Sequence, residues 1–144
     1  MFHFIMNRVY RYDIHGKSVL KTLNKFYATD FGVKKIKTNS KEVNYAHVLE
    51  NVVYNELVNE GYDVYIGKMK TSEIDFIAFD GKGLKYIQVC YSLKDENTLK
   101  REIEVLEEID DSYPKYIILI DKEDYGRGGI KHLNIFDFLM NDDF

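Results

Sequence analysis

The order of hydrophobic patterns along the second two thirds of this sequence is its strongest constraint on folding. Segment 43–60 repeats apolar residues at helical spacing and is followed by Gly61, which favours a helix end. A second helical repeat covers 96–109. Strand-like segments lie at 63–66, 73–79, 84–91 and 115–121. The order helix, three strands, helix, strand predicts an α/β fold, with a mixed sheet flanked by helices.

The predicted inner side of the first helix carries Ala46, Leu49, Val52, Val53 and Leu57. The second helix places Leu99, Ile103, Leu106 and Ile109 on one stripe. The strands at 73–79 and 84–91 flank Asp80-Gly81-Lys82-Gly83, which is typical of a hairpin turn. A short strand at 132–135 and a helical turn in the segment FDFLM close the predicted fold.

The N-terminal part of the chain is predicted to be a basic arm. Segment 8–14 (RVYRYDI) alternates charged with apolar or aromatic residues, which is typical of a strand. Segment 18–28 follows the turn at His15-Gly16 and would pair with it as the second strand, so we expect a β-hairpin. The Lys-rich stretch 33–41 has no periodicity and reads as a loop. We therefore divide the chain into an arm over 1–42 and an α/β domain over 43–144.

The charge distribution supports this division. Residues 1–44 carry nine Lys and Arg against three Asp and Glu, a net charge of +6. Residues 45–144 carry eleven against twenty-one, a net charge of −10. Two surfaces with different partners are one interpretation, and a solvated basic hairpin and loop are the other.

Composition excludes several classes of protein. With 45% hydrophobic and 31% charged residues among 144, the chain is not globally disordered. Its single Cys90 cannot form an internal disulfide, and the N-terminus does not resemble a secretory signal. No apolar stretch approaches the ~20 residues that span a bilayer. We expect a cytoplasmic protein without a membrane partner.

Gly16-Lys17-Ser18 resembles the end of a phosphate-binding P-loop. That motif requires a glycine five positions before Gly16 and a helix after it. Position 11 is Arg, and the segment reads as a hairpin. We therefore expect no nucleotide cofactor and no ATPase activity in this chain.

Glu50, Asp75, Gln88 and Cys90 form the most informative polar set. Glu50 lies in or beside the apolar stripe of its helix, where an unpaired carboxylate is costly. Asp75 and Gln88 lie on two predicted hairpin strands, and they meet near the end of the sheet if their faces coincide. Such a pocket would suit Mg²⁺, which prefers oxygen ligands. A purely structural alternative is that Asp75 caps a bulge and Glu50 pairs with a lysine.

The runs EIDFIA (73–78), YIQV (86–89) and LEN (49–51) resemble the PD-(D/E)XK nuclease superfamily. More narrowly, residues 8–140 resemble the C-terminal half of a prokaryotic family of AAA-type ATPases. In that family the ATPase is followed by a winged-helix segment and a nuclease-like domain of unknown function. The matching stretches are RYDIHGKSVLKTLNKFYATDFGV, LENVVYNELVNEGYDVYIGK, EIDFIA, YIQVCYSL, KREIEVLEEIDDSYPKYIILID and GIKHLNIFDFL.

The resemblance implies a restriction-endonuclease-like core, with the hairpin arm as a winged-helix remnant. It implies that Glu50 is the acid of the first helix, that Asp75 binds the metal, and that Gln88 replaces the second acid. Cys90 stands where the superfamily pattern has its lysine. Four other lysines remain candidates for that role: Lys68, Lys70, Lys85 and Lys94. Arg101-Glu102 also fits the family, but a helix-surface ion pair is the favoured explanation of these two residues.

Two functions follow as alternatives. The first is a degenerate nuclease-fold module that binds nucleic acid or a protein partner and is normally attached to an AAA-type ATPase. The second is a Mg²⁺-dependent nuclease in which Glu50 and Asp75 bind the metal and Gln88 assists catalysis. The cysteine at position 90 and the acidic core favour the first. In either case we expect Lys34, Lys35 and Lys37 to contact nucleic-acid phosphates.

Overall fold

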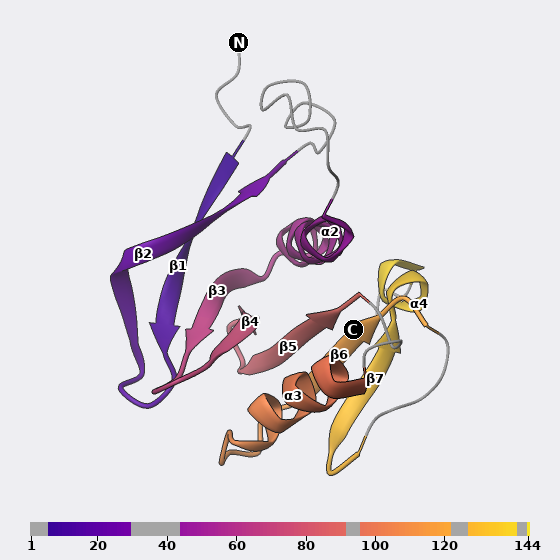
Figure 1. Ribbon diagram of the computed structural model, residues 1–144. Helices are drawn as coiled ribbons and strands as arrows, with labels where there is room; N and C mark the ends of the chain where they lie inside the picture. Colours follow the sequence, from indigo (N-terminus) through magenta and orange to yellow (C-terminus); the bar gives the residue numbers. More distant parts are fainter. Residues whose placement is uncertain (1–5, 30–43, 92–95, 122–126, 141–143) are drawn as a thin grey trace.

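The fold is centred on a seven-stranded mixed sheet with the strand order β2-β1-β3-β4-β5-β6-β7 (Figure 1). The computed structural model describes residues 6–29, 44–91, 96–121, 127–140 and 144. The strands are β1 (Met6–Asp13), β2 (Ser18–Ala28), β3 (Asp63–Lys68), β4 (Glu73–Phe79), β5 (Leu84–Cys90), β6 (Lys115–Leu119) and β7 (Ile130–Asn134). The helices are α2 (Tyr45–Asn59), α3 (Glu96–Glu107) and α4 (Ile135–Met140). The predicted α/β fold with a mixed sheet flanked by helices is confirmed.

The sheet combines two antiparallel units with parallel additions. The predicted N-terminal hairpin is present as the antiparallel pair β1 and β2, and β1 runs parallel to β3. Strands β3, β4 and β5 form an antiparallel meander, and β6 and β7 continue the sheet in parallel to β5. The hairpin is thus one edge of the same sheet. The predicted boundary at residue 42 and the predicted loop 33–41 fall outside the described residues.

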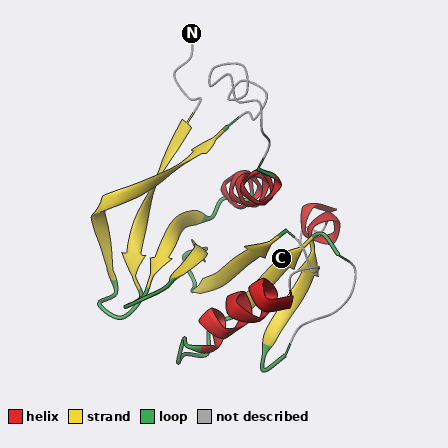
Figure 2. Cartoon of the chain, viewed as in Figure 1, coloured by secondary structure: helices red, strands yellow, loops and turns green. Residues whose placement is uncertain are grey.

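Helices cover both faces of the sheet (Figure 2). Helices α2 and α4 share one core with the sheet, built around Val53, Leu57 and Phe138. Helix α3 packs on the opposite face, where Leu99, Ile103 and Leu106 are buried. The predicted stripe of the second helix is confirmed, although Ile109 is buried just beyond the end of α3. No helix within the described ranges has the length and apolar character that crossing a bilayer requires.

The inner face of α2 agrees with the predicted one at Leu49, Val53 and Leu57 and differs at other positions. Ala46 is exposed and Val52 is only partly buried, whereas Tyr54 and the polar Asn51 are buried. The Asn51 side chain accepts a hydrogen bond from the Ala28 amide (2.9 Å) and donates one to its carbonyl oxygen (2.7 Å). Burial of Asn51 is tolerable because both ends of its amide are bonded. These bonds hold the end of β2 against α2.

Candidate functional site

A bulge in β4 shapes the site. Tyr65 of β3 pairs with Ile77, and Gly67 pairs with Ile74, so three steps along β4 oppose two along β3. The bulged stretch contains Asp75. A Cβ atom at Gly67 would lie 2.8 Å from the Cβ of Ile74, so glycine permits the close approach of the strands here. Bulges re-aim side chains and are frequent beside active sites.

The backbone ladder between β4 and β5 stops at the same place, at the pair Phe76 and Ile87. Beyond this pair, side-chain oxygens accept the hydrogen bonds that backbone carbonyl groups accept in a regular ladder. The Val89 amide donates to Oδ2 of Asp75 (2.8 Å), and the Asp75 amide donates to Oε1 of Gln88 (2.7 Å). Asp75 and Gln88 are therefore adjacent near the end of the sheet, but Gln88 bonds to the backbone amide of Asp75 and not to its carboxylate, which was the predicted partner.

Three carboxylates from three elements face one cavity of about 380 Å³. Glu50 comes from α2, Asp75 from β4 and Glu102 from α3. The cavity is lined by Ala46, Glu50, Asp75, Val89, Cys90, Tyr91, Thr98 and Glu102. The two predicted metal ligands, Glu50 and Asp75, are thus brought together, whereas Gln88 is not among the lining residues.

Gln88 acts as a buried bridge between two acids. Its side chain is 1% exposed, and besides accepting from the Asp75 amide it donates from Nε2 to Oε2 of Glu102 (2.7 Å). Both ends of the amide are used, as burial of a polar group requires. Gln88 therefore positions its neighbours instead of pointing into the cavity.

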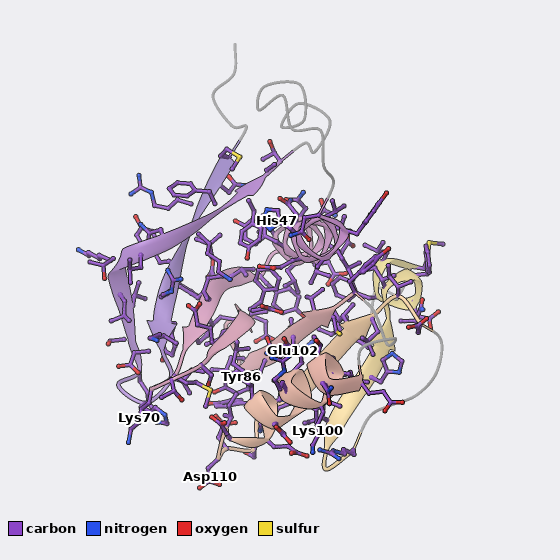
Figure 3. The ribbon with its side chains drawn as sticks, viewed as in Figure 1. His47, Lys70, Tyr86, Lys100, Glu102 and Asp110 are labelled. Atoms are coloured by element: carbon purple, nitrogen blue, oxygen red, sulfur yellow. The ribbon has the colours of Figure 1, made fainter. Side chains whose placement is uncertain are left out.

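Glu102 is the site residue that the sequence interpretation underrated. The sequence favoured a helix-surface ion pair with Arg101. Instead, Glu102 of α3, labelled in Figure 3, accepts a hydrogen bond from the Gln88 amide and lines the cavity. A signal was present in the sequence. Glu102 follows Leu99 by three residues and precedes Leu106 by four, so it lies along the buried stripe of its helix.

Burial and the charge of Glu50 raise the pKa values of the other two acids of the cavity. Burial raises the pKa of Asp75 from its ordinary 3.8 to about 8, and the negative charge of Glu50 adds to this effect. Burial also raises the pKa of Glu102, again with a contribution from Glu50. A site that raises the pKa of its acids favours the uptake of positive charge, either protons or a cation.

Two side chains of β2 also contact Glu50. The buried Tyr27 hydroxyl donates to Oε1 of Glu50, and Nζ of Lys25 lies 3.7 Å from the same oxygen. The purely structural alternative, a bulge at Asp75 and a lysine beside Glu50, therefore describes two real features. These features coexist with a cavity that both acids line.

The donor chemistry of the cavity fits a hard divalent cation, because such ions prefer carboxylate oxygens. Glu50 and Asp75 would hold the ion, and Glu102 faces the same space. Among the described residues, however, no three His, Cys, Asp or Glu side chains are already gathered closely enough to hold a metal ion. Binding would therefore require small side-chain movements.

The predicted lysine candidates that lie in the described part of the chain, Lys68, Lys70 and Lys85, do not line this cavity. Cys90, which the sequence resemblance aligns with a lysine, lines the cavity and is 4% exposed. Lys85 donates to the Tyr62 hydroxyl (2.9 Å) and lies over the Phe144 ring, while Lys70 is well separated from Glu102 in Figure 3. Lys68 is the last residue of β3.

The remaining candidate, Lys94, lies outside the described residues, as do the predicted phosphate contacts Lys34, Lys35 and Lys37.

Comparisons with known proteins give one relative. A protein of Haemophilus influenzae (strain ATCC 51907 / DSM 11121 / KW20 / Rd), described as uncharacterized, is 38% identical over 140 residues, which is 95% of this chain. The chain spans about a third (34%) of that relative's length. No protein-family profile matches the chain, and no solved structure matches it.

Proposed function

We propose that this chain is a nuclease-fold module that binds nucleic-acid phosphates through a divalent cation held by Glu50 and Asp75. The observation that carries the proposal is the convergence of Glu50, Asp75 and Glu102 on one cavity. Without a cation these acids would repel a phosphate, whereas a bound cation would attract one. Binding of nucleic acid at this site should therefore depend on the metal.

The fold supports the nuclease part of the proposal. Its central run is α2, the meander β3-β4-β5, α3 and the parallel strand β6. We propose that this run is a restriction-endonuclease-like core. The position of Asp75, at a bulge where the strand ladder stops, is the kind of irregular position at which functional side chains are often placed.

We also propose that the module belongs with an AAA-type ATPase, as the sequence resemblance implies. About two thirds of the length of the relative lies outside the match, which would leave room for a further domain in that protein. The ATPase would be another part of such a protein or a separate partner. A role for Lys34, Lys35 and Lys37 on nucleic-acid phosphates stays a prediction from the sequence.

Hydrolysis of phosphodiester bonds is the second candidate, and the position of Glu102 favours it. The superfamily pattern has an acid at the position of Gln88, and here the Gln88 amide is hydrogen-bonded to the carboxylate of Glu102. Glu102 would thereby restore the acidic character of the pocket from a different element. The metal would supply an activated water and stabilise charge on the phosphate.

Titration calorimetry with Mn²⁺ tests the metal site. We expect one site in the intact chain and a loss of affinity of at least about tenfold in Asp75→Asn. This variant keeps a side-chain oxygen for the Val89 amide. Asp63→Asn, at an exposed position of β3, is the matched control and should bind like the parent. Equal affinity in Asp75→Asn and the parent would refute the proposed metal site.

Fluorescence polarisation then tests the role of the metal in binding. A labelled oligonucleotide, single- or double-stranded, should bind in the presence of Ca²⁺, and EDTA or Asp75→Asn should release it. Oligonucleotide binding that is unchanged by EDTA and by Asp75→Asn would place the nucleic-acid surface elsewhere on the protein.

A further inference from the structure

We propose that Lys25 performs the role of the lysine that is absent from position 90. This inference rests on the second candidate function, hydrolysis, at the metal site proposed above, and adds a catalytic residue to it. The ammonium group of Lys25 would approach the site from β2 and stabilise the negative charge that develops on a bound phosphate during hydrolysis. The two groups that β5 lacks, an acid and a lysine, would then come from α3 and β2.

The position of Lys25 is fixed by its neighbours. The register of β1 and β2 shifts between Val9, which pairs with Lys25, and Arg11, which pairs with Leu20. The extra residues of β2 form a bulge, and Leu23 within it has a φ of 56°, which is unusual for a side chain of this kind. After this bulge, Lys25 lies beside Glu50, although Lys25 itself is not among the residues that line the cavity.

Contacts on both sides hold this end of β2 against the site. The hydroxyl of Tyr27 donates to Glu50, and its ring packs against Phe76, which follows Asp75. The amide of Asn51 clamps Ala28, the last residue of β2. The strand is thus anchored on α2 at two successive residues, Tyr27 and Ala28, and this holds the backbone of β2 near Glu50.

The charge of Lys25 acts on several acids around the site. Its Nζ lies 3.7 Å from Oε1 of Glu50. Burial raises the pKa values of Asp75 and Glu102, and the charge of Lys25 opposes this rise. At Glu73 the effect of burial is outweighed by Arg11, which lowers the pKa of that carboxyl, and Lys25 adds to this lowering. Arg11 forms a closer ion pair, with Glu73 (2.5 Å). Lys25 retains about a third of its side-chain exposure (34%), so it is accessible to a substrate.

The reaction that requires this cation is the hydrolysis of a phosphodiester. The oxygen of water forms a bond to phosphorus while the bond from phosphorus to the leaving sugar oxygen breaks. One proton of the water passes to solvent, and a proton from solvent reaches the leaving oxygen, so the products are a phosphomonoester and an alcohol. Extra negative charge accumulates on the phosphoryl oxygens in the transition state, and a fixed ammonium group stabilises it.

Cleavage of a labelled oligonucleotide, DNA or RNA, by the intact chain in Mn²⁺ tests the inference. We expect Lys25→Met to lower kcat about 100-fold, with little change in KM or in Mn²⁺ affinity. Lys25→Arg should retain more activity than Lys25→Met because it keeps the charge. Lys21→Met, at an exposed position of the same strand, is the matched control and should cleave like the parent.

A rescue experiment separates catalysis from a structural role. Cys90 lines the same cavity, so Cys90→Lys in the Lys25→Met background would return an ammonium group to the site. We expect this double variant to regain cleavage. A structural role for Lys25 would instead lower the melting temperature without allowing rescue from position 90. If the double variant does not fold, the comparison of Lys25→Arg with Lys25→Met still decides the question.

The outcomes distinguish this inference from the proposed function. Mn²⁺ binding without any cleavage by the parent would overturn the role of Lys25 and leave the metal-dependent binding module in place. Equal cleavage by the parent and Lys25→Met would also overturn it, and would direct the search to another lysine. Absence of Mn²⁺ binding would refute the proposed metal site itself.

Discussion

The two ends of the β4–β5 hairpin are built in different ways. Toward the turn, a regular ladder runs from the pair Phe76 and Ile87 to the pair Phe79 and Leu84. The Asp80 carboxylate closes the turn by accepting from two backbone amides, at 2.9 and 3.0 Å. At the other end, side chains of Asp75 and Gln88 take the place of backbone partners.

The difference shows how one hairpin provides both stability and a site. Phe76 and Ile77 near the regular end are fully buried and belong to the two cores. The irregular end buries polar groups, and these require complete hydrogen bonding to be tolerated. The ionised form of Asp75 remains unfavourable in the folded protein, because burial and neighbouring acids raise its pKa to about 8. Substitutions at the two ends should therefore have different consequences.

The largest effect on stability is expected from Phe76→Ala. The ring is fully buried and packs against those of Tyr27 and Tyr54, with centroids 5.4 and 6.0 Å away. Its removal should cost about 3–5 kcal/mol, since it leaves a cavity in the core. Urea unfolding measures this loss, and a cost below about 1 kcal/mol would contradict the packing described here.

Gln88→Ala should lower the free energy of unfolding by about 1–3 kcal/mol, because the Asp75 amide loses its acceptor and Glu102 loses its donor.

Gln88→Glu gives a sharper comparison. It keeps an acceptor for the amide but places a carboxylate beside Glu102, so it should destabilise the protein in EDTA and regain stability when Mn²⁺ is added. Thermal unfolding with and without Mn²⁺ measures both. A Mn²⁺ response no larger than that of the parent would count against the acidic pocket as a metal site.

The pH dependence of stability in EDTA should reflect Asp75. Its pKa is about 8 in the folded protein against an ordinary value of 3.8. Between these values the folded protein binds a proton that the unfolded chain has released, so the free energy of unfolding should fall as pH rises from about 4 to 8. The slope for one proton is at most about 1.4 kcal/mol per pH unit. Asp75→Asn should flatten this dependence, and parallel profiles for the two proteins would contradict the assignment.

The smallest effect is expected at the turn. Gly81 has a φ of 84°, and a Cβ atom there would contact nothing within 4 Å. Gly81→Ala should therefore cost only about 1 kcal/mol, from backbone strain alone. Mn²⁺ affinity should remain that of the parent, because the turn is at the opposite end of the hairpin. A loss of Mn²⁺ affinity in Gly81→Ala would show that the two ends are coupled.

Local patterns in the sequence were sufficient to predict most of the architecture. The stripe of α3, the hairpin turn at Asp80 and the alternation of β4 and β5 each depend on residues that are close together in the chain. The same alternation predicted that Asp75 and Gln88 meet. The inner face of α2 was predicted less well, because Asn51 is buried by bonds to Ala28, more than twenty residues away.

Tertiary structure alone decided how the polar groups are arranged. The sequence by itself determined an α/β fold, because hydrophobic period and turn chemistry act over a few residues. It did not determine that Glu102 bonds to Gln88 or that Lys25 lies beside Glu50. Those contacts join α3 to β5 and β2 to α2, and they depend on a bulge in β4, a bulge in β2 and the packing of helices on both faces. A single charged residue in a helix or strand carries no local mark of its distant partner, so only the folded chain brings these groups together.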